Sequence, residues 1–281
     1  MATWDLGGDG PALVVFHATG FHGRCYVPLA GALGESFHCF AVDQRGHGAS
    51  APAAEGDYRW SKMSQDVVVA VEALGLDRPF AFGHSLGGGL ASLVEAGRPR
   101  TFRALWLFEP IIFPAEFFPA DPEHGLVGIS RRRRWEFDSL GDALFNYASK
   151  PPFDRFRADA LWHYVSGGLE SDGGRAGVRL HLSPDDEAET FAAARHSGSH
   201  EAAIAVEAPT TLACGTIDPV TPPTFLAEVA KAMKYAEVEV LEGLSHFGPF
   251  EDPASVAALM KKALGARKPS PSVREPVAPP R

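Results

Sequence analysis

Short apolar runs that end in glycine-bearing loops recur along this chain, with helix-like stretches between them. The runs lie at residues 12–17, 37–42, 79–83, 104–108, 210–214 and 238–241. Apolar runs of this length are typical of strands that are buried on both faces, and their alternation with helices is typical of parallel sheets. The pattern therefore predicts an α/β fold, with an open, mostly parallel sheet and helices on both faces.

Two helices have recognisable starts. Residues 61–74 place Met63, Val67, Ala70, Val71 and Leu74 on one face, and Ser61 can cap this helix at its beginning. Near the end of the chain, Asp252-Pro253 predicts the start of a last helix, since proline is favoured in the first turn.

Composition excludes several functional classes. The chain has 281 residues, 45% of them hydrophobic and 22% charged, which suits one large globular domain. Its formal net charge of −9 disfavours phosphate backbones and anionic lipid surfaces as partners, so we expect no nucleic acid. No run approaches the ~20 apolar residues of a membrane span, and the first residues do not resemble a secretion signal, so we expect a cytoplasmic protein.

Three cysteines, Cys25, Cys39 and Cys214, lie at wide spacing. An odd number at such spacing suits free thiols in a reducing compartment and provides neither a disulfide framework nor a pair of metal ligands. His196 and His200 have a spacing of four residues but lack a third ligand, so no metal site is predicted.

One stretch interrupts the alternation of strands and helices. Residues 111–205 lack strand-like runs and carry helix-like segments broken by proline and glycine, so we interpret them as a helical cap between two parts of a core, 1–110 and 206–266. The part from 111 to 165 has about twice the aromatic content of the whole chain, which is 10%. Most of these rings would pack the cap, and a minority, for which we name Phe113, Trp135 and Phe137, would face a substrate cavity.

One polar segment lies inside this cap and another lies at the end of the chain. Residues 131–134 are four arginines, for which a solvated helix face is the commoner interpretation and a docking surface the rarer one. The proline-rich residues 267–281 have almost no apolar content, which predicts a disordered tail.

The sequence Gly83-His84-Ser85-Leu86-Gly87 follows an apolar run and precedes a helix-like stretch, which is the context in which the motif G-x-S-x-G is meaningful. A serine in such a turn has a strained backbone, so its neighbours at two residues' distance must be small. The turn exposes the hydroxyl of Ser85 to solvent and points the amide of Leu86 at a developing oxyanion. Ser85 is therefore the predicted nucleophile.

On these residues the chain resembles the α/β-hydrolase superfamily, over roughly residues 10–265. The resemblance implies that the turn His17-Ala18-Thr19-Gly20-Phe21 contributes a second oxyanion amide, that of Thr19, with alanine in place of the usual glycine. It also implies that the D-x-R-G-x-G-x-S turn of residues 43–50 is structural. Only about ten residues precede the first strong strand, so we expect the sheet to lack one or two of the family's first strands.

The family order of nucleophile, acid and histidine directs the search for the base to the end of the chain. His246 follows the last expected strand, where a loop can bring its imidazole over Ser85. His17 and His84 flank the site and are expected to support loops by hydrogen bonds.

Two carboxylates compete for the role of orienting His246. By the resemblance, Asp218 holds the place of the acid in the motif G-x-x-D after the strand at 210–214, and it is the preferred candidate. Glu109 is the rival, because some members of the superfamily draw the acid from the strand before the cap.

These residues predict a serine hydrolase that works by acyl transfer without a cofactor. Ser85 would attack the carbonyl of a small or medium apolar ester or lactone, with His246 as base and Asp218 as orienter. A hydrolase of carbon–carbon bonds in diketones would need the same residues, and a small-ligand receptor that retains the triad is a further alternative.

Overall fold

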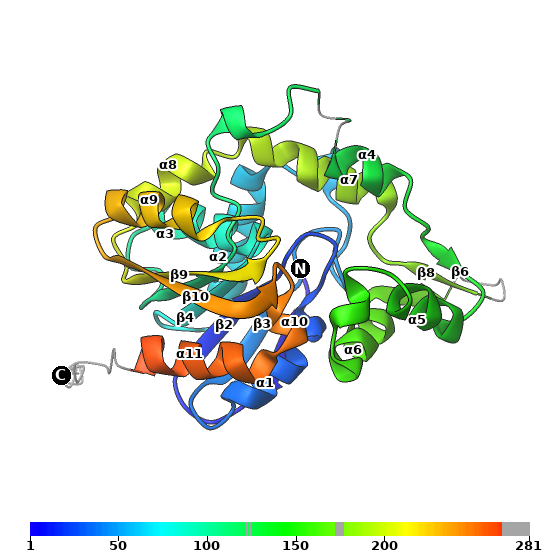
Figure 1. Cartoon of the computed structure of the whole chain (residues 1–281), viewed down its shortest axis with the longest axis horizontal. Helices are drawn as coiled ribbons and strands as arrows, with labels where there is room; N and C mark the ends of the chain where they lie inside the picture. The colour runs from blue at the N-terminus through cyan, green and yellow to red at the C-terminus, as the bar shows by residue number, and fades with distance from the viewer. Residues whose placement is uncertain (122, 124, 172–176, 266–281) are drawn as a thin grey trace, which may run out of the picture.

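A computed structural model describes residues 1–121, 123, 125–171 and 177–265, and a seven-stranded sheet forms its centre (Figure 1). The strands are β1 (Thr3–Gly7), β2 (Ala12–Phe16), β3 (His38–Val42), β4 (Phe80–His84), β5 (Leu105–Phe108), β9 (Thr210–Ile217) and β10 (Ala236–Ser245). They are ordered β1-β3-β2-β4-β5-β9-β10, and every pair except β1–β3 is parallel. All six predicted runs form strands, and the predicted α/β-hydrolase fold class is confirmed.

The edge strand β1 was not recognised in the sequence. It pairs antiparallel with β3, and its residues alternate between exposed and half-buried positions, which is a weaker pattern than that of the central strands. The indole of Trp4 donates a hydrogen bond to Asp43 at 2.8 Å, which fastens this edge.

The two faces of the sheet bury alternate side chains of the same strand. Leu13 and Val15 belong to one apolar cluster, and Val14 and Phe16 to the other. Helices α1 (Val27–Leu33) and α11 (Pro253–Gly265) cover the first face, and α2 (Trp60–Ala73), α3 (Leu86–Gly97) and α9 (Pro223–Ala232) cover the second (Figure 1). The sheet is therefore buried on both sides, as parallel strands require.

The starts of two helices test the capping predictions. Helix α2 begins at Trp60 after the N-cap residue Arg59, whose side chain makes no capping bond, so the predicted cap at Ser61 is wrong by two residues. The apolar face is confirmed at Met63, Val67, Ala70 and Val71, all buried. The carboxylate of Asp252 accepts a hydrogen bond from the amide of Ser255 at 3.0 Å, so α11 begins where Asp252-Pro253 predicts.

The insertion between β5 and β9 contains helices and also a small sheet. The helices are α4 (Leu126–Arg131), α5 (Leu140–Ala148), α6 (Ala158–Gly168), α7 (Pro184–Ala192) and α8 (Ser199–Ala205), and the strands are β6 (Glu136–Phe137), β7 (Leu169–Ser171) and β8 (Val178–Leu180). The strands pair in the antiparallel order β6-β8-β7, so the expectation of a purely helical insertion is wrong. These strands have two or three residues, too few for a period of two to be visible in the sequence.

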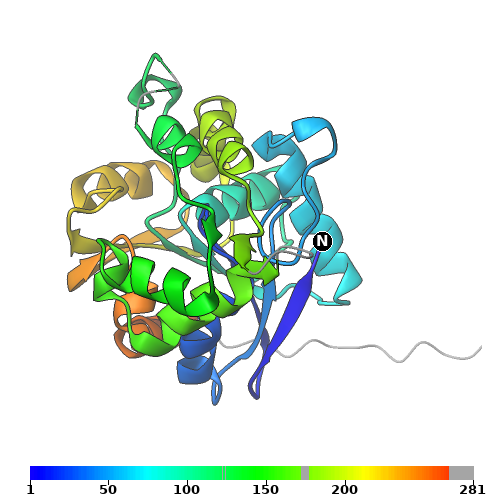
Figure 2. The ribbon, with the colours of Figure 1, turned by 90° about the vertical axis from the view of Figure 1, so that its right-hand side faces the viewer.

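The remaining elements are short. They are the 3-10 turns η1 (Gly23–Tyr26), η2 (Ala54–Gly56), η3 (Ala115–Phe117), η4 (Phe153–Arg155) and η5 (Ala193–His196) and the helical turn α10 (Gly248–Glu251). Figure 2 looks onto the insertion and shows its helices in front of the sheet. Helix α8 is an exception, because it packs against α3 of the core.

Several expectations concern features outside the sheet. Cys25, Cys39 and Cys214 are buried and free. The predicted disordered tail, 267–281, lies outside the described residues. Within the part of the chain that the structure describes, no helix has the length and apolar character needed to cross a membrane.

Candidate active site

Ser85 occupies a sharp turn between β4 and α3. Its backbone has φ 54° and ψ −116°, a conformation that side-chain-bearing residues rarely adopt and that marks a strained turn. A Cβ on Gly87 would lie 2.1 Å from the carbonyl oxygen of Phe16, and one on Gly83 would lie 2.7 Å from the Cα of Gly88. Only glycine fits at either position, which is the physical reason for the motif G-x-S-x-G.

Ser85 as a whole residue is 6% exposed. Neighbouring loops pack closely around the turn. The amide of Ile111 donates to the carbonyl of Ser85 at 3.1 Å, and the ring of His84 bonds the carbonyl of His246 at 2.8 Å. The loops after β5 and β10 are thus fastened to the turn that carries the predicted nucleophile.

Two backbone segments carry the amides that are predicted to form the oxyanion hole. Leu86 opens helix α3, and Thr19 lies in the loop after β2 and is 8% exposed. In this loop the amide of Ala18 donates to the hydroxyl of Tyr26 at 3.3 Å, and the amide of Phe21 donates to the carbonyl of Ala18 at 3.1 Å. These bonds fix the loop on both sides of Thr19.

His246 lies directly after β10, and its ring contacts the carboxylate of Glu109. Nδ1 lies 2.8 Å from Oε2 of Glu109, with the two side chains 12% and 0% exposed. Since a carboxylate accepts hydrogen bonds, Nδ1 carries the proton and Nε2 is left as the basic nitrogen. This is the tautomer that a general base requires.

Backbone amides surround the carboxylate of Glu109. Gly215 donates to Oε1 at 3.1 Å, and Val220 and Thr221 donate to Oε2 at 2.7 and 3.4 Å. Glu109 itself has a positive φ of 40°, a strained conformation at the carboxyl end of β5. The loop after β9 therefore folds around the side chain of Glu109 and holds it against His246.

The prediction that Asp218 orients His246 is wrong for this structure, where Glu109 occupies that position. Asp218 is exposed, with a φ of 44°, in the same loop that wraps Glu109. The loop directs its amides inward to Glu109, and a second carboxylate in this buried place would repel the first. Glu109, the rival candidate, was recognisable in the sequence because it directly follows the apolar run at 104–108.

His17 and His84 hold loops together, as expected. The amide of Gln44 donates to Nε2 of His17 at 2.8 Å, and Nδ1–H of His17 donates to the carbonyl of Ala18 at 2.8 Å. Burial lowers the pKa of both imidazoles well below the usual range. The turn at residues 43–50 is also held internally, since Asp43 accepts bonds from the amides of Gly23 and Ala49 at 2.6 and 2.9 Å.

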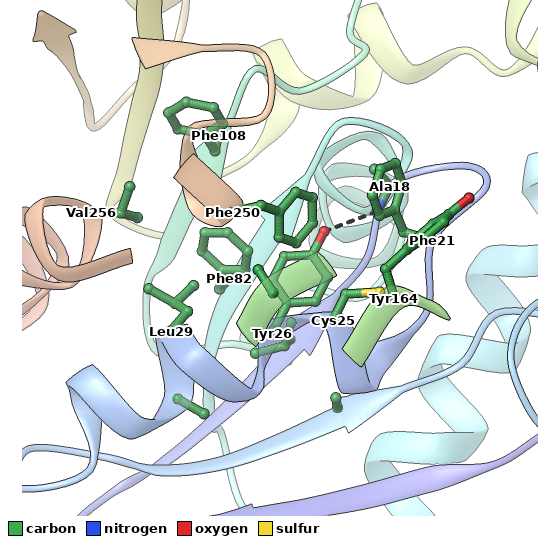
Figure 3. Close-up of a cluster of buried hydrophobic side chains, with 14 of the residues drawn as sticks. Ala18, Phe21, Cys25, Tyr26, Leu29, Phe82, Phe108, Tyr164, Phe250 and Val256 are labelled. Atoms are coloured by element: carbon green, nitrogen blue, oxygen red, sulfur yellow. Dashed lines mark hydrogen bonds between the residues drawn. The ribbon is translucent and has the colours of Figure 1, made fainter. Parts of the chain in front are cut away.

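An aromatic cluster joins the insertion to the core beside His246. Phe21 of the core lies 6.2 Å from Phe156 and 5.1 Å from Tyr164 of the insertion, measured between ring centroids. Phe156 also lies 5.7 Å from Phe247, the residue after His246. Figure 3 shows Phe21 and Tyr164 side by side next to the loop of Ala18.

The three aromatic residues named for the cavity have other ring neighbours, although Phe137 reaches Tyr164 through the ring of Tyr147. Phe113 stacks with Phe117 and Phe225, and the ring of Phe137 contacts Tyr147 within the insertion. Trp135 lies beneath the guanidinium of Arg179. Among the ring contacts of the described residues, none joins these three to Phe21 or His246, so their role in a substrate cavity stays a prediction.

The arginines at 131–134 are mostly paired within the insertion. Arg131 bonds Glu123, Asp185 and Glu189, and Arg134 bonds Asp142. Arg133 is largely buried and donates to Glu187 and to the hydroxyls of Tyr147 and Tyr164. Neither a bare solvated face nor a free docking surface describes Arg133, whose charge Glu187 neutralises.

A small cavity lies between the insertion and the loop after β2. It is lined by residues of both parts, namely Gly20, Phe21, His22, Gly48, Arg133, Tyr164, Gly168, Leu180 and Leu182. Oε1 of Glu187 approaches so closely that a Cβ on Gly20 would lie 2.3 Å from it. The insertion thus lies directly on the loop that carries the predicted oxyanion amide.

Among residues 1–121, 123, 125–171 and 177–265, no three histidine, cysteine or acidic side chains gather in a group that could hold an ion. Nδ1 of His200 instead bonds the carbonyl of Ile112 at 3.0 Å.

This fold and this strand-to-helix serine turn define a class of hydrolytic enzymes, and comparison with known proteins agrees. The profile of the alpha/beta hydrolase family matches residues 13–259, most of the chain. The chain therefore belongs to the alpha/beta hydrolase family.

Individual relatives are more distant. The 2-(acetamidomethylene)succinate hydrolase of Mesorhizobium japonicum is 28% identical over 166 residues, which span 58% of each chain. The monoglyceride lipase of Homo sapiens is 34% identical over 115 residues, which are 39% of this chain and only 38% of the lipase. A crystal structure of E-2-(acetamidomethylene)succinate hydrolase superposes with a TM-score of 0.80 at 22% identity, covering 94% of both chains.

Proposed function

We propose that this protein is a serine hydrolase that cleaves a carboxylic ester or lactone of a small to medium apolar substrate. The observations that carry the proposal are the strained turn at Ser85, whose neighbour His84 bonds the carbonyl of His246, and the contact of the His246 ring with the buried Glu109. The proposed catalytic residues are Ser85 as nucleophile, His246 as base and Glu109 as orienter. The amides of Thr19 and Leu86 form the proposed oxyanion hole.

In the proposed mechanism, Oγ of Ser85 attacks the carbonyl carbon while its proton passes to Nε2 of His246. The oxygen of the tetrahedral intermediate accepts hydrogen bonds from the two amides. His246 then gives its proton to the leaving alcohol, and the acyl group remains on Ser85. A water molecule, deprotonated by His246, cleaves this acyl-enzyme and restores the serine.

Glu109 stabilises the imidazolium that forms in both steps. It is buried and already accepts bonds from Gly215, Val220 and Thr221. Because its position is set by backbone amides, it needs no rearrangement when His246 becomes charged, and this favours rapid proton transfer.

The choice of an ester rests on the serine and on the surroundings of the site. A serine nucleophile suits carbonyl substrates, and the insertion, proposed as a lid over residues 111–205, brings aromatic rings beside His246. Glu187 neutralises the buried Arg133, which leaves no free cation there to select an anionic substrate. One relative is named a lipase, which supports an ester as the scissile group.

Replacing Ser85 tests the nucleophile. We expect Ser85→Ala to lower kcat for p-nitrophenyl esters by ~10³-fold or more, with the circular dichroism spectrum unchanged, because only the attacking oxygen is lost. Near-wild-type turnover in this variant would refute the assignment of Ser85.

The same assay separates the alternatives. An esterase should turn over p-nitrophenyl butanoate many times per molecule. A receptor that keeps the triad should stop after one acylation, and a hydrolase of carbon–carbon bonds should cleave a vinylogous diketone faster than any ester in the series.

A further inference from the structure

We propose that Tyr26 and His84 are positioning residues that hold the backbone of His246 and thereby align its imidazole with Ser85. The proposal rests on the proposed function and concerns a chain of hydrogen bonds that reaches from the oxyanion loop to the base. Neither Tyr26 nor His84 belongs to the proposed triad of Ser85, His246 and Glu109.

The chain has three bonds. The amide of Ala18 lies 3.3 Å from the hydroxyl oxygen of Tyr26, a contact drawn in Figure 3. That hydroxyl lies 2.8 Å from Nδ1 of His84, and Nε2 of His84 lies 2.8 Å from the carbonyl oxygen of His246.

The chemistry of its two ends sets the direction of every bond. The amide of Ala18 can only donate, so the hydroxyl of Tyr26 accepts there and donates its own proton to Nδ1 of His84. The carbonyl of His246 can only accept, so Nε2 of His84 carries the proton. His84 is therefore held as a single neutral tautomer.

Burial makes this arrangement stable. Tyr26 and His84 are both 0% exposed, so water does not compete for these bonds. The rings of Phe82 and Phe250 flank Tyr26 in Figure 3, with centroids 5.7 and 5.0 Å from its own. An unpaired polar atom in such surroundings is costly, which favours the geometry that satisfies all three bonds.

The same burial keeps His84 neutral during the reaction. Its ring lies 5.0 Å from that of His246, and burial, with the nearby His246, lowers the pKa of His84 well below its usual range. A proton on Nδ1 would also leave the hydroxyl proton of Tyr26 without an acceptor. His84 can thus keep its bond to the His246 carbonyl while the ring of His246 gains and loses a proton.

The chain touches three loops whose relative positions decide the proposed catalysis. Ala18 precedes Thr19 of the oxyanion loop, His84 precedes Ser85, and the last bond ends on His246. A rigid polar connection between them sets the distance from base to nucleophile, to which rates are sensitive.

Removing one hydroxyl tests the proposal. We expect Tyr26→Phe to lower kcat for p-nitrophenyl butanoate about tenfold, because both buried hydrogen bonds of this hydroxyl are lost, with KM unchanged. The matched control is Tyr58→Phe, because Tyr58 is 2% exposed and its hydroxyl accepts the amide of Ala53 at 3.2 Å. This control loses a comparable bond outside the chain and should keep the wild-type kcat.

A rescue experiment probes the last bond. Gln at position 84 can place an amide N–H where Nε2 lies, whereas leucine cannot, so His84→Gln should retain more activity than His84→Leu. In the wild type, ¹⁵N spectra of histidine-labelled protein should show His84 protonated on Nε2 alone, and Tyr26→Phe should give a mixture of tautomers.

A covalent probe separates this proposal from the proposed function. With diisopropyl fluorophosphate, Oγ of Ser85 forms a bond to phosphorus, fluoride leaves and the serine proton passes to His246. Slower labelling in Tyr26→Phe, with the altered tautomer, would support the proposal. Wild-type labelling and kcat in Tyr26→Phe, or a wild-type His84 protonated on Nδ1, would overturn it. If the wild-type protein were neither labelled at Ser85 nor able to turn over esters, the proposed function would be refuted. The tautomer of His84 would then still decide whether the proposed hydrogen-bond chain exists.

Discussion

Strained backbones occur at two of the residues on which the proposed chemistry depends. Ser85 and Glu109 both have positive φ, 54° and 40°, at the carboxyl ends of the neighbouring strands β4 and β5. Parallel strands end at the same edge of a sheet, so the nucleophile and the orienting carboxylate lie at one edge. Strain of this kind persists only where surrounding bonds hold it, as the amides around Glu109 do.

The identity of the acid can be tested with two substitutions. We expect Glu109→Gln to lower kcat by ~10³–10⁴-fold, because an amide cannot hold His246 in the tautomer with Nε2 free or stabilise its charge. Asp218→Asn should keep nearly the wild-type rate, since Asp218 is exposed and the bond to Nδ1 of His246 is made by Glu109. Steady-state kinetics on one p-nitrophenyl ester, with circular dichroism as the check on folding, measures both.

If Asp218→Asn lowered kcat more than Glu109→Gln, the orienting carboxylate would be that of Asp218, in the loop after β9. In that case the carboxylate of Asp218 would have to replace Glu109 at Nδ1 of His246 in the working enzyme.

At the scale of elements, the insertion and the core meet through side chains that surround the site. Nε2 of His22 bonds the carbonyl of Tyr164 at 3.1 Å, and the indole of Trp60 donates to the carbonyl of Thr190 at 3.2 Å. Arg155 of the insertion pairs with Glu251 at 2.8 Å, and Glu251 accepts bonds from Ser245, the residue before His246. The insertion is therefore connected to the segment after β2, which carries Thr19, and to the end of β10, which precedes His246.

The ring of Phe156 should limit the length of the acyl chain. We expect kcat/KM for p-nitrophenyl esters to rise about fourfold per methylene and then to stop rising when the pocket is full. Phe156→Ala should move this break to a longer chain, because the ring lies between Phe21 and Phe247. A series from acetyl to decanoyl esters locates the break in each protein.

Phe113→Ala is the matched control for this series. Its ring packs against Phe117 and Phe225, on a different part of the molecule. If both variants gave the wild-type profile, the cluster around Phe21 would be packing alone. If only Phe113→Ala moved the break, the original assignment of Phe113 to the cavity would be correct.

For the whole molecule, buried imidazoles make stability depend on pH. Burial lowers the pKa of His17, His22, His47 and His84, for His22 to about 4. Below the usual pKa near 6.5, the unfolded chain takes up protons that the folded chain cannot, so the free energy of unfolding falls as pH falls. Above that pH both states are neutral at these residues and their contribution is constant.

We expect the free energy of unfolding, measured by urea titration, to fall steeply between pH 6.5 and 4. His22 alone contributes about 3 kcal/mol of this fall, since one pKa unit corresponds to ~1.4 kcal/mol. In His22→Asn the unfolded chain takes up one proton fewer over this range, so the free energy of unfolding should depend less steeply on pH. Replacement of the exposed His196 by Asn should leave this pH dependence unchanged. A free energy of unfolding that is flat over this range would show that these rings are protonated in the folded state.

Local patterns in the sequence determined much of this protein. Six of the seven strands and the turn at Ser85 were predicted because buried strands demand apolar runs and the turn demands glycines at 83 and 87. Each of these features depends on residues within a few positions of one another, so the sequence carries them directly. The place of His246 was predicted from the family order and from its position after the last expected strand.

The tertiary structure decided how distant segments pair. Glu109 rather than Asp218 lies against His246 because the loop after β9 turns its amides toward Glu109, and nothing local to either carboxylate reveals that choice. The chain from Ala18 through Tyr26 and His84 to His246 joins four residues that span more than 200 positions. Such bonds form only when the strands are already ordered in the sheet, and so they are properties of packing rather than of sequence pattern.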